Sequence, residues 1–264
     1  MNNEIGIGIL DLYTQEDLNN CLKSVPQDFI YRGDGDPRPN QVFVVSNNNN
    51  KDPYGVVQEY KKYTTSVQLA TMRNWLISQM RLKGLKYYFL IHSNQVIKNP
   101  EIFEKTLKLA DTFGTWIITG ASTDNIPLED DEKGVTLNLS KHLNTEFLFL
   151  FSGIVKTFGY FDERYFNSLQ LDVLDYVTKV RNKNAYPPNN YHPTIPSDWL
   201  ESGIGNINKL GFKDMPDQSR DVQLSYAHFL NEHKYLPTQN DPPHVSQEEL
   251  LKSMEVIQTN YAKK

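Results

Sequence analysis

The chain contains 264 residues, of which 39% are apolar and 22% charged, and its formal net charge is −5. This composition is typical of a globular protein with a sizeable core. The acidic balance excludes the basic footprint of a nucleic-acid-binding protein, and it gives no reason to expect a membrane surface as a partner.

The sequence carries no recognisable targeting signal. No apolar run reaches the roughly 18 residues that a membrane span needs. The start, MNNEIGIGIL, lacks the basic stretch and long apolar core of a secretory signal. Cys21 is the only cysteine, which leaves no internal disulfide. We therefore expect a cytoplasmic protein.

Strand and helix patterns alternate over the first 120 residues or so. In chain order they are a strand at 5–14, a helix at 15–25, a strand with its polar loop at 41–50, a helix at 65–84, a strand at 86–91, a helix at 99–114 and a strand at 115–122. Such alternation predicts an α/β fold with a mainly parallel sheet covered by helices on both faces. Ligands of these sheets bind beyond the carboxyl ends of the strands. We therefore expect the loops after Leu10, Val45, Ile91 and Gly120 to converge on one site.

The pattern changes in the second half of the chain. A polar, acidic connection at 122–134 leads to a strand, a short helix and an aromatic loop at 145–166, and then to a helix at 168–182. Prolines interrupt the stretch 185–199, which predicts irregular structure. Two further helices are expected at 223–236 and 246–264. These helices would pack on the preceding domain or on a protein partner.

The order of these pieces resembles the GT-A-fold glycosyltransferases, especially the large family 2. ATMRNWLI matches the family's a.aRN.gi helix at Arg73 and Asn74, and FSGIVKTFGYFDERYF matches its block ending in GgFDErff. YYFLIHSNQVIKNPEIF lies over its metal-binding strand and loop. The resemblance covers residues 1–182 and implies a Rossmann-like GT-A sheet that binds a nucleotide-sugar donor, with an unknown acceptor. Residues 183–264 would form an irregular and helical extension.

The chain diverges from the family where the metal is usually held. The family's aspartate after the second strand is Ser46 here, and its DxD motif is replaced by Ser93, Asn94 and Gln95. Divalent cations prefer anionic oxygen ligands, so these neutral groups would bind Mg²⁺ or Mn²⁺ weakly. We expect the donor side to have lost its negative charge, with no protein-bound metal and no other cofactor. Arg73 or Lys98 would then neutralise a leaving diphosphate.

His92, which follows the strand predicted at 86–91, is not an obvious replacement ligand. In an alternating strand its side chain points away from that of Ser93. Metal sites normally need three or more converging ligands. A single histidine beside a buried strand is more typical of a structural residue.

The resemblance also implies roles for individual residues. The general base of an inverting transfer falls on Asp172, although a carboxylate near a helix start also favours the helix dipole. Asp162 and Glu163 fall on the acceptor side, where a capping or turn role explains them equally well. The residues implied on the donor side are Asp11, Tyr13, Ser46, Arg73, Asn74, Ser93 and Gln95, with Tyr13 able to stack on a base.

Two functions remain open at this stage. The first is a glycosyltransferase of hexosyltransferase type that works without a protein-bound metal. The second is a catalytically inactive GT-A-fold protein with a binding role or a structural role in an assembly. The retained RN and FDER motifs and Asp172 favour the first function, whereas the loss of several acids together favours the second. The fold alone does not decide, because function depends on the site.

Overall fold

The structure is a computed structural model. It describes residues 2–30, 41–47, 50–51, 53, 56–65, 67–130, 133–165, 171–183, 185–187, 191–202, 218–234 and 252.

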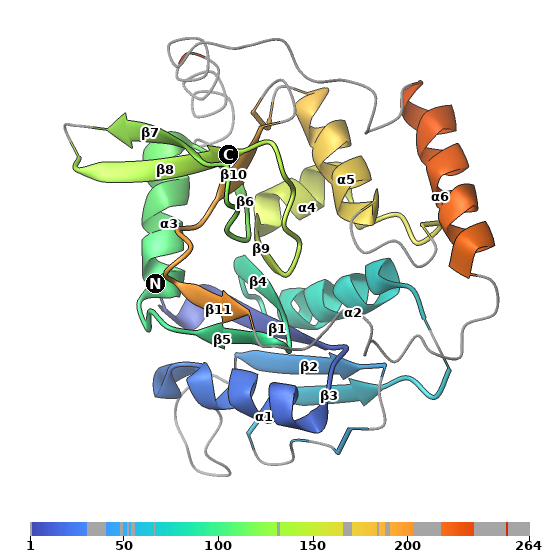
Figure 1. Ribbon diagram of the computed structural model, residues 1–264. Helices are drawn as coiled ribbons and strands as arrows, with labels where there is room; N and C mark the ends of the chain where they lie inside the picture. Colours follow the sequence, from blue (N-terminus) through green and yellow to red (C-terminus); the bar gives the residue numbers. More distant parts are fainter. Residues whose placement is uncertain are drawn as a thin grey trace.

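A nine-stranded sheet with the order β3-β2-β1-β4-β9-β6-β10-β8-β7 forms the centre of the molecule (Figure 1). Its strands are β1 (Ile5–Asp11), β2 (Val42–Ser46), β3 (Glu59–Lys62), β4 (Tyr87–His92), β6 (Ile117–Thr119), β7 (Ile126–Asp130), β8 (Val135–Ser140), β9 (Phe147–Phe151) and β10 (His192–Thr194). β9 and β8 run against their neighbours, and the other strands of this sheet share one direction. The predicted α/β fold with a mainly parallel sheet is confirmed.

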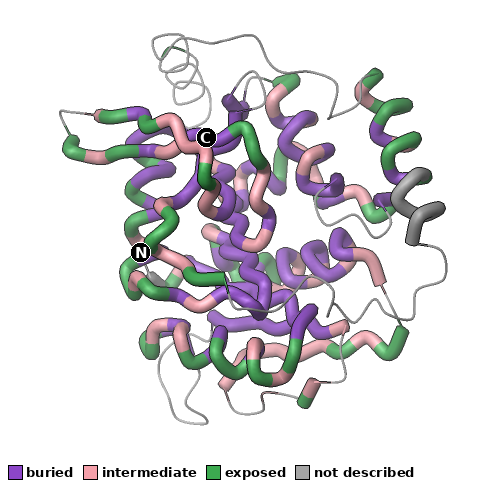
Figure 2. The backbone as a smooth tube through the Cα atoms, in the orientation of Figure 1, coloured by how far each residue is buried: buried purple, intermediate pink, exposed green. Residues whose placement is uncertain are grey.

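Helices cover both faces of this sheet. They are α1 (Gln15–Ser24), α2 (Leu69–Leu82), α3 (Ile102–Phe113), α4 (Ser152–Phe158) and α5 (Leu171–Arg181). A further helix, α6 (Gln218–His233), packs against α5. The buried side chains of α1 and α3 belong to one apolar core, and those of α2, α4 and α5 belong to a second core on the other face. Every residue of β1 and β2 is buried, which is why these strands read as continuous apolar runs (Figure 2).

Local sequence signals set the helix boundaries that position the site. At the start of α1, Asp17 N donates to Thr14 Oγ1 at 3.2 Å and Thr14 N donates to the Asp17 carboxylate at 3.0 Å, which forms a capping box. Gly84 follows α2 with a φ of 73°, a conformation that glycine adopts without strain. Gly6 lets α2 approach the sheet, because a Cβ there would lie 2.4 Å from Met80 Sδ.

Several elements differ from the sequence prediction. β3 and β10 were not expected, and the predicted connection at 122–134 contributes to the hairpin β7–β8. The residues of this hairpin alternate between apolar side chains that point inward, such as Leu128 and Leu137, and polar side chains that point outward. α3 begins at Ile102 rather than directly after Asn99. The helix predicted at 246–264 lies outside the described residues, apart from residue 252.

A second sheet pairs β5 (Gln95–Ile97) with β11 (Leu200–Ser202) in antiparallel register. It joins the loop after β4 to the C-terminal part of the chain, with Gln95 opposite Ser202. Residues after 182 thus contribute β10 to the main sheet, β11 to the second sheet and α6 to the helical layer. Within the part of the chain that the structure describes, no helix has the length and apolar character required to cross a membrane.

Candidate functional site

The carboxyl ends of β1, β2 and β4 meet around Asp11, the last residue of β1. Its Oδ2 atom accepts a hydrogen bond from Ser46 Oγ at 2.6 Å, and its Oδ1 atom accepts a longer one from Ser93 Oγ at 3.4 Å. The Asn50 amide donates to Asp11 Oδ1 at 2.8 Å and to the Tyr13 carbonyl at 3.0 Å. Asp11, Ser46 and Ser93 are all buried. The predicted convergence of these three strand ends is confirmed.

Two rings lie beside this cluster. Tyr13 is buried, and burial, followed by the charges of Glu146 and Asp17, raises the pKa of its hydroxyl. The His92 ring lies 6.4 Å from the Tyr13 ring, and neither of its nitrogens has a hydrogen-bond partner among the described residues. Burial, helped by the nearby Arg73 charge, lowers the pKa of His92 to about 3. His92 is therefore neutral at pH 7.

Glu146, which precedes β9, is a site residue that the sequence analysis missed. Its Oε2 atom accepts from Gln95 Nε2 at 2.7 Å and from Ser202 Oγ at 3.4 Å, and its Oε1 atom accepts from Asn94 Nδ2 at 3.3 Å. β9 runs against β4, so its amino end lies at the same edge as the carboxyl end of β4. The expectation of an uncharged donor side needs correction, because the carboxylates of Asp11 and Glu146 lie there.

The side chains of the Ser93–Gln95 loop do not fit a divalent cation. Ser93 offers only a hydroxyl, and the Gln95 side chain donates from its amide nitrogen to Glu146 and to Ser202. Both oxygens of Glu146 already accept hydrogen bonds from neutral groups. Among the described residues, no group of three or more His, Cys, Asp or Glu side chains could hold a metal ion. We derive no step that uses a metal.

Arg73 on α2 and Asp172 on α5 form a buried ion pair. Arg73 Nη1 lies 2.5 Å from Asp172 Oδ2, and the two side chains are 0% and 1% exposed. Burial raises the pKa of Asp172, and the adjacent guanidinium opposes this rise. The Nε and Nη2 atoms of Arg73 have no hydrogen-bond partner among the described residues. The predicted base and a predicted donor-side residue thus contact each other.

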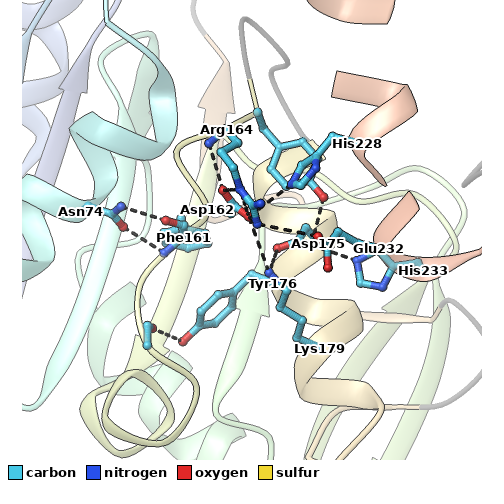
Figure 3. A network of polar contacts seen from close by, with 12 residues as sticks. Asn74, Phe161, Asp162, Arg164, Asp175, Tyr176, Lys179, His228, Glu232 and His233 are labelled. Atoms are coloured by element: carbon cyan, nitrogen blue, oxygen red, sulfur yellow. Dashed lines mark hydrogen bonds and ion pairs between the residues drawn. The ribbon is translucent and has the colours of Figure 1, made fainter. Parts of the chain in front are cut away.

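Asn74, the next residue of α2, holds the aromatic loop after α4. It accepts from Phe161 N at 2.9 Å and donates to Phe161 O at 2.9 Å, a double contact that Figure 3 shows. Its amide also donates to Glu163 Oε1 at 2.8 Å, and Thr71 Oγ1 donates to Glu163 Oε2 at 3.0 Å. The RN and FDER motifs are therefore in direct contact, through Asn74 and Glu163.

Replacing Asn74 with alanine should lower the free energy of unfolding by about 2 kcal/mol, because the buried backbone groups of Phe161 would lose their partners. Urea denaturation of both proteins measures this difference. Gln79→Ala is the matched control, since it truncates a side-chain amide on the same helix that makes no hydrogen bond to the described residues, and it should cost less than about 0.5 kcal/mol. Equal costs for the two variants would show that the contact with Phe161 contributes nothing to stability.

Asp162 lies in a polar network that attaches α6 to α5 (Figure 3). Its Oδ2 atom lies 2.6 Å from Arg164 Nη2 and 3.3 Å from His228 Nε2 of α6. Burial alone would raise the pKa of Asp162, but the hydrogen bonds from Arg164 and His228 outweigh it and hold the pKa below its ordinary value. In the same network, Asp175 on α5 accepts from His233 at 2.8 Å. Asp162 is thus bound to α6, while Glu163 is bound to α2.

The residues predicted for the site fall into separate groups. Asp11, Ser46 and Ser93 form one hydrogen-bonded cluster, with Tyr13 beside it. Gln95 belongs to a neighbouring cluster around Glu146. The remaining predicted residues form three further contacts, namely Arg73 with Asp172, Asn74 with Glu163, and Asp162 with His228.

No known protein-family model matches this sequence, and no curated protein sequence matches it. Solved structures do resemble it. The mannosyltransferase PcManGT from Pyrobaculum calidifontis, in complex with GDP-mannose and Mn²⁺, has a TM-score of 0.52 at 10% identity, with 97% of this chain and 74% of that chain covered. A structure of S. aureus TarS residues 1–349 has a TM-score of 0.51 at 12% identity, with 98% and 73% covered.

A longer structure of S. aureus TarS gives a TM-score of 0.52 at 12% identity, and the match covers 97% of this chain but only 44% of that chain. At such low identity these likenesses show the fold alone. The chain therefore shares the fold of these structures, in agreement with the GT-A-like fold that its sequence predicted.

Proposed function

We propose that this protein is a divergent glycosyltransferase that transfers a sugar from a nucleotide-sugar donor without a protein-bound metal. The observation that carries the proposal is the cluster of Asp11, Ser46 and Ser93 at the carboxyl ends of three adjacent strands. This is the edge at which ligands of open α/β sheets bind. The fold, shared with a mannosyltransferase that was solved with GDP-mannose and Mn²⁺, supports the part of the proposal that concerns a nucleotide-sugar donor.

In this proposal residues 1–182 form the nucleotide-sugar part and residues 183–264 pack on it. Asp11, Tyr13 and Ser46 contact the nucleoside. The bound nucleoside takes the place of the Asn50 amide, which donates to Asp11 in the free protein. Ser93 contacts the diphosphate, and Gln95 contacts the sugar. The positive charge that stabilises the leaving diphosphate comes from Arg73, whose Nε and Nη2 atoms have no hydrogen-bond partner among the described residues. Lys98 lies in an exposed ion pair with Glu201.

Asp172 takes the proton from the acceptor hydroxyl as the hydroxyl oxygen attacks the anomeric carbon and the nucleoside diphosphate leaves. Burial raises the pKa of Asp172, which favours a general base. Asp162 and Glu163 lie on the loop before α5 and border the acceptor side.

Replacing Asp172 with asparagine should lower turnover at least about a hundredfold, because the amide cannot take up the proton. The amide oxygen still accepts from Arg73, which favours folding of the variant. Turnover would be measured by release of nucleoside diphosphate, at a temperature where both proteins give the same circular dichroism. Asp111→Asn, on the exposed face of α3, is the control and should keep full activity. An unchanged rate in Asp172→Asn would remove Asp172 from the mechanism.

A specific observation favours the second function, a catalytically inactive protein with a binding or assembly role. Asp172 is 1% exposed and paired with Arg73, so an acceptor would have to displace protein groups to reach it. α6 also exposes the apolar side chains of Leu224 and Leu230, which fits contact with a protein partner through the C-terminal helices.

A thermal-shift screen separates the two functions. Uridine, guanosine, thymidine and cytidine diphosphate sugars would each be added with EDTA and with Mn²⁺. A ligand at 100 times its Kd stabilises the native state by about 2.7 kcal/mol, which raises the melting temperature by several degrees. A shift with one donor in EDTA supports the transferase. No shift with any of them favours the inactive protein.

A further inference from the structure

A pocket of about 200 Å³ lies where β6 ends, next to the loop after β4. Drug-sized ligands occupy pockets of about 300–1,000 Å³, so this one suits a single ring rather than a whole nucleotide. Six of its lining residues have uncharged polar side chains, and Ala121, Phe147 and Leu200 supply the apolar ones. The polar residues are Gln95, Ser122, Thr123, Asn144, Ser197 and Ser202.

Hydrogen bonds hold the wall of this pocket in place. The Asn144 side chain donates to Ala121 O at 2.8 Å and accepts from Glu146 N at 3.0 Å, and Gly120 N donates to Asn144 O at 2.9 Å. A Cβ at Gly120 would lie 2.8 Å from the Asn144 side chain, so the two segments meet at this glycine. The loop after β6 is therefore fixed to the segment that carries Glu146.

The pocket has a negative charge at its wall and no positive charge in its lining. None of the described residues that line it is Lys or Arg. Glu146 contacts two lining residues, Gln95 and Ser202, and no cation among the described residues lies within ion-pair distance of it. The carboxylates of Asp172, Asp162 and Asp175, by contrast, each face an Arg or Lys. Phosphates and carboxylates are therefore disfavoured in this pocket.

The lining can both donate and accept hydrogen bonds. Among the described residues, the Gln95 side chain makes hydrogen bonds only through its amide nitrogen, so its Oε1 atom is available as an acceptor. The hydroxyl hydrogens of Ser122 and Ser202 are donated to Asp124 and Glu146, so these two oxygens offer only acceptor lone pairs to a ligand. The hydroxyls of Thr123 and Ser197, which also line the pocket, make no side-chain hydrogen bond to the described residues and can act in either direction. The apolar side chains of Phe147 and Leu200 can pack against the C–H face of a ring.

We propose that this pocket binds an uncharged, hydroxyl-rich ring, a neutral sugar, and that Glu146 is the positioning residue that orients Gln95 and Ser202 and sets the preference for a neutral ligand. The inference deepens the proposed function, on which it rests, by assigning a sugar subsite and its charge preference. It does not depend on the identity of the nucleotide.

The test measures binding of free sugars to the full chain by saturation-transfer NMR and calorimetry. Glucose, galactose, mannose and N-acetylglucosamine are the neutral probes, and glucuronate and inorganic phosphate are the charged ones. At least one neutral sugar should bind, and glucuronate and phosphate should bind at least tenfold more weakly. Ala121→Leu, which fills the pocket from its rim, should weaken sugar binding at least tenfold.

Glu146→Gln tests the charge separately from the shape. It should reduce the preference for glucose over glucuronate by about tenfold, an effect that a general loss of packing would not produce. Lys108→Ala, in a different groove beside Phe29 and Glu104, is the control and should leave sugar binding unchanged. Equal binding of glucuronate and glucose by the wild-type protein, or no effect of Ala121→Leu, would overturn the proposal.

The same samples are titrated with nucleoside diphosphates. If a nucleoside diphosphate binds and no neutral sugar does, the pocket proposal fails while the proposed function stands. If a neutral sugar binds as predicted and no nucleotide does, the pocket stands and the transferase function fails. If neither class of ligand binds, both proposals are overturned.

Discussion

Replacing Arg73 with methionine is expected to lower the free energy of unfolding by about 3–5 kcal/mol, because it leaves the buried carboxylate of Asp172 without its partner. The two side chains are 0% and 1% exposed, so water cannot take over the lost contact. Urea denaturation at pH 7 measures the change. Arg81→Met, at the exposed end of the same helix, is the control and should cost less than about 1 kcal/mol.

A second variant separates the missing partner from the missing packing. In the double variant Arg73→Met/Asp172→Leu both charges are removed and apolar groups of similar size remain. It should recover most of the stability lost in Arg73→Met, since buried ion pairs are often replaced by apolar groups at little cost. If Arg73→Met alone costs less than about 1 kcal/mol, the pair is not held in a buried, charged state.

The stability of the protein should fall as the pH is lowered from about 6.5 toward 4.5. His92 and His192 are buried, and burial is the main cause that lowers the pKa of each to about 3. An unfolded histidine has a pKa near 6.5, so below that pH the unfolded chain binds protons that the folded chain does not. Each histidine should then lower the free energy of unfolding by up to about 1.4 kcal/mol per pH unit.

Asparagine at both positions should remove most of this pH dependence. At His192 the amide can still contact the Tyr186 hydroxyl, which lies 3.0 Å from His192 Nδ1. His142→Asn is the control, because the His142 side chain is 78% exposed. Denaturation midpoints between pH 7.5 and pH 4.5 measure the effect. If the double variant keeps the slope of the wild-type protein, other groups cause the acid sensitivity.

Asp162 and Asp175 do not interfere in this pH range, whereas Asp172, whose pKa is raised by burial, takes up protons in the folded state and opposes the histidine effect. The pKa values of Asp162 and Asp175 lie below their ordinary values, because hydrogen bonds from basic groups outweigh the effect of burial. A lowered pKa contributes stability above the unfolded value of about 4, and this stability is lost only as the pH falls below it. The histidine effect can therefore be measured above pH 4.5 without a contribution from these two groups.

The first part of the fold was predictable because its strands are buried on both faces. β1, β2 and β4 read as continuous apolar runs, and their alternation with helices predicts parallel pairing. β10 was not predictable, since three residues that include Pro193 carry no periodic signal. This strand forms because β6 and β8 lie on either side of it, a tertiary effect that the local sequence does not contain.

The site was predictable only where topology alone brings residues together. Asp11, Ser46 and Ser93 follow from the rule that parallel strands end at one edge. Glu146 was missed because the antiparallel direction of β9 is not evident from the sequence. The ion pair between Arg73 and Asp172 joins positions 99 residues apart, so no local pattern could have shown that the predicted base is already paired.

Calorimetric titration of the donor found in the thermal-shift screen, with EDTA and then with Mn²⁺, tests the central claim most directly. If the neutral Ser93–Gln95 loop holds the donor without a protein-bound metal, the Kd should agree within about threefold in the two buffers, a difference below about 0.7 kcal/mol. Binding that requires Mn²⁺, or that is more than about tenfold tighter with it, would contradict the account.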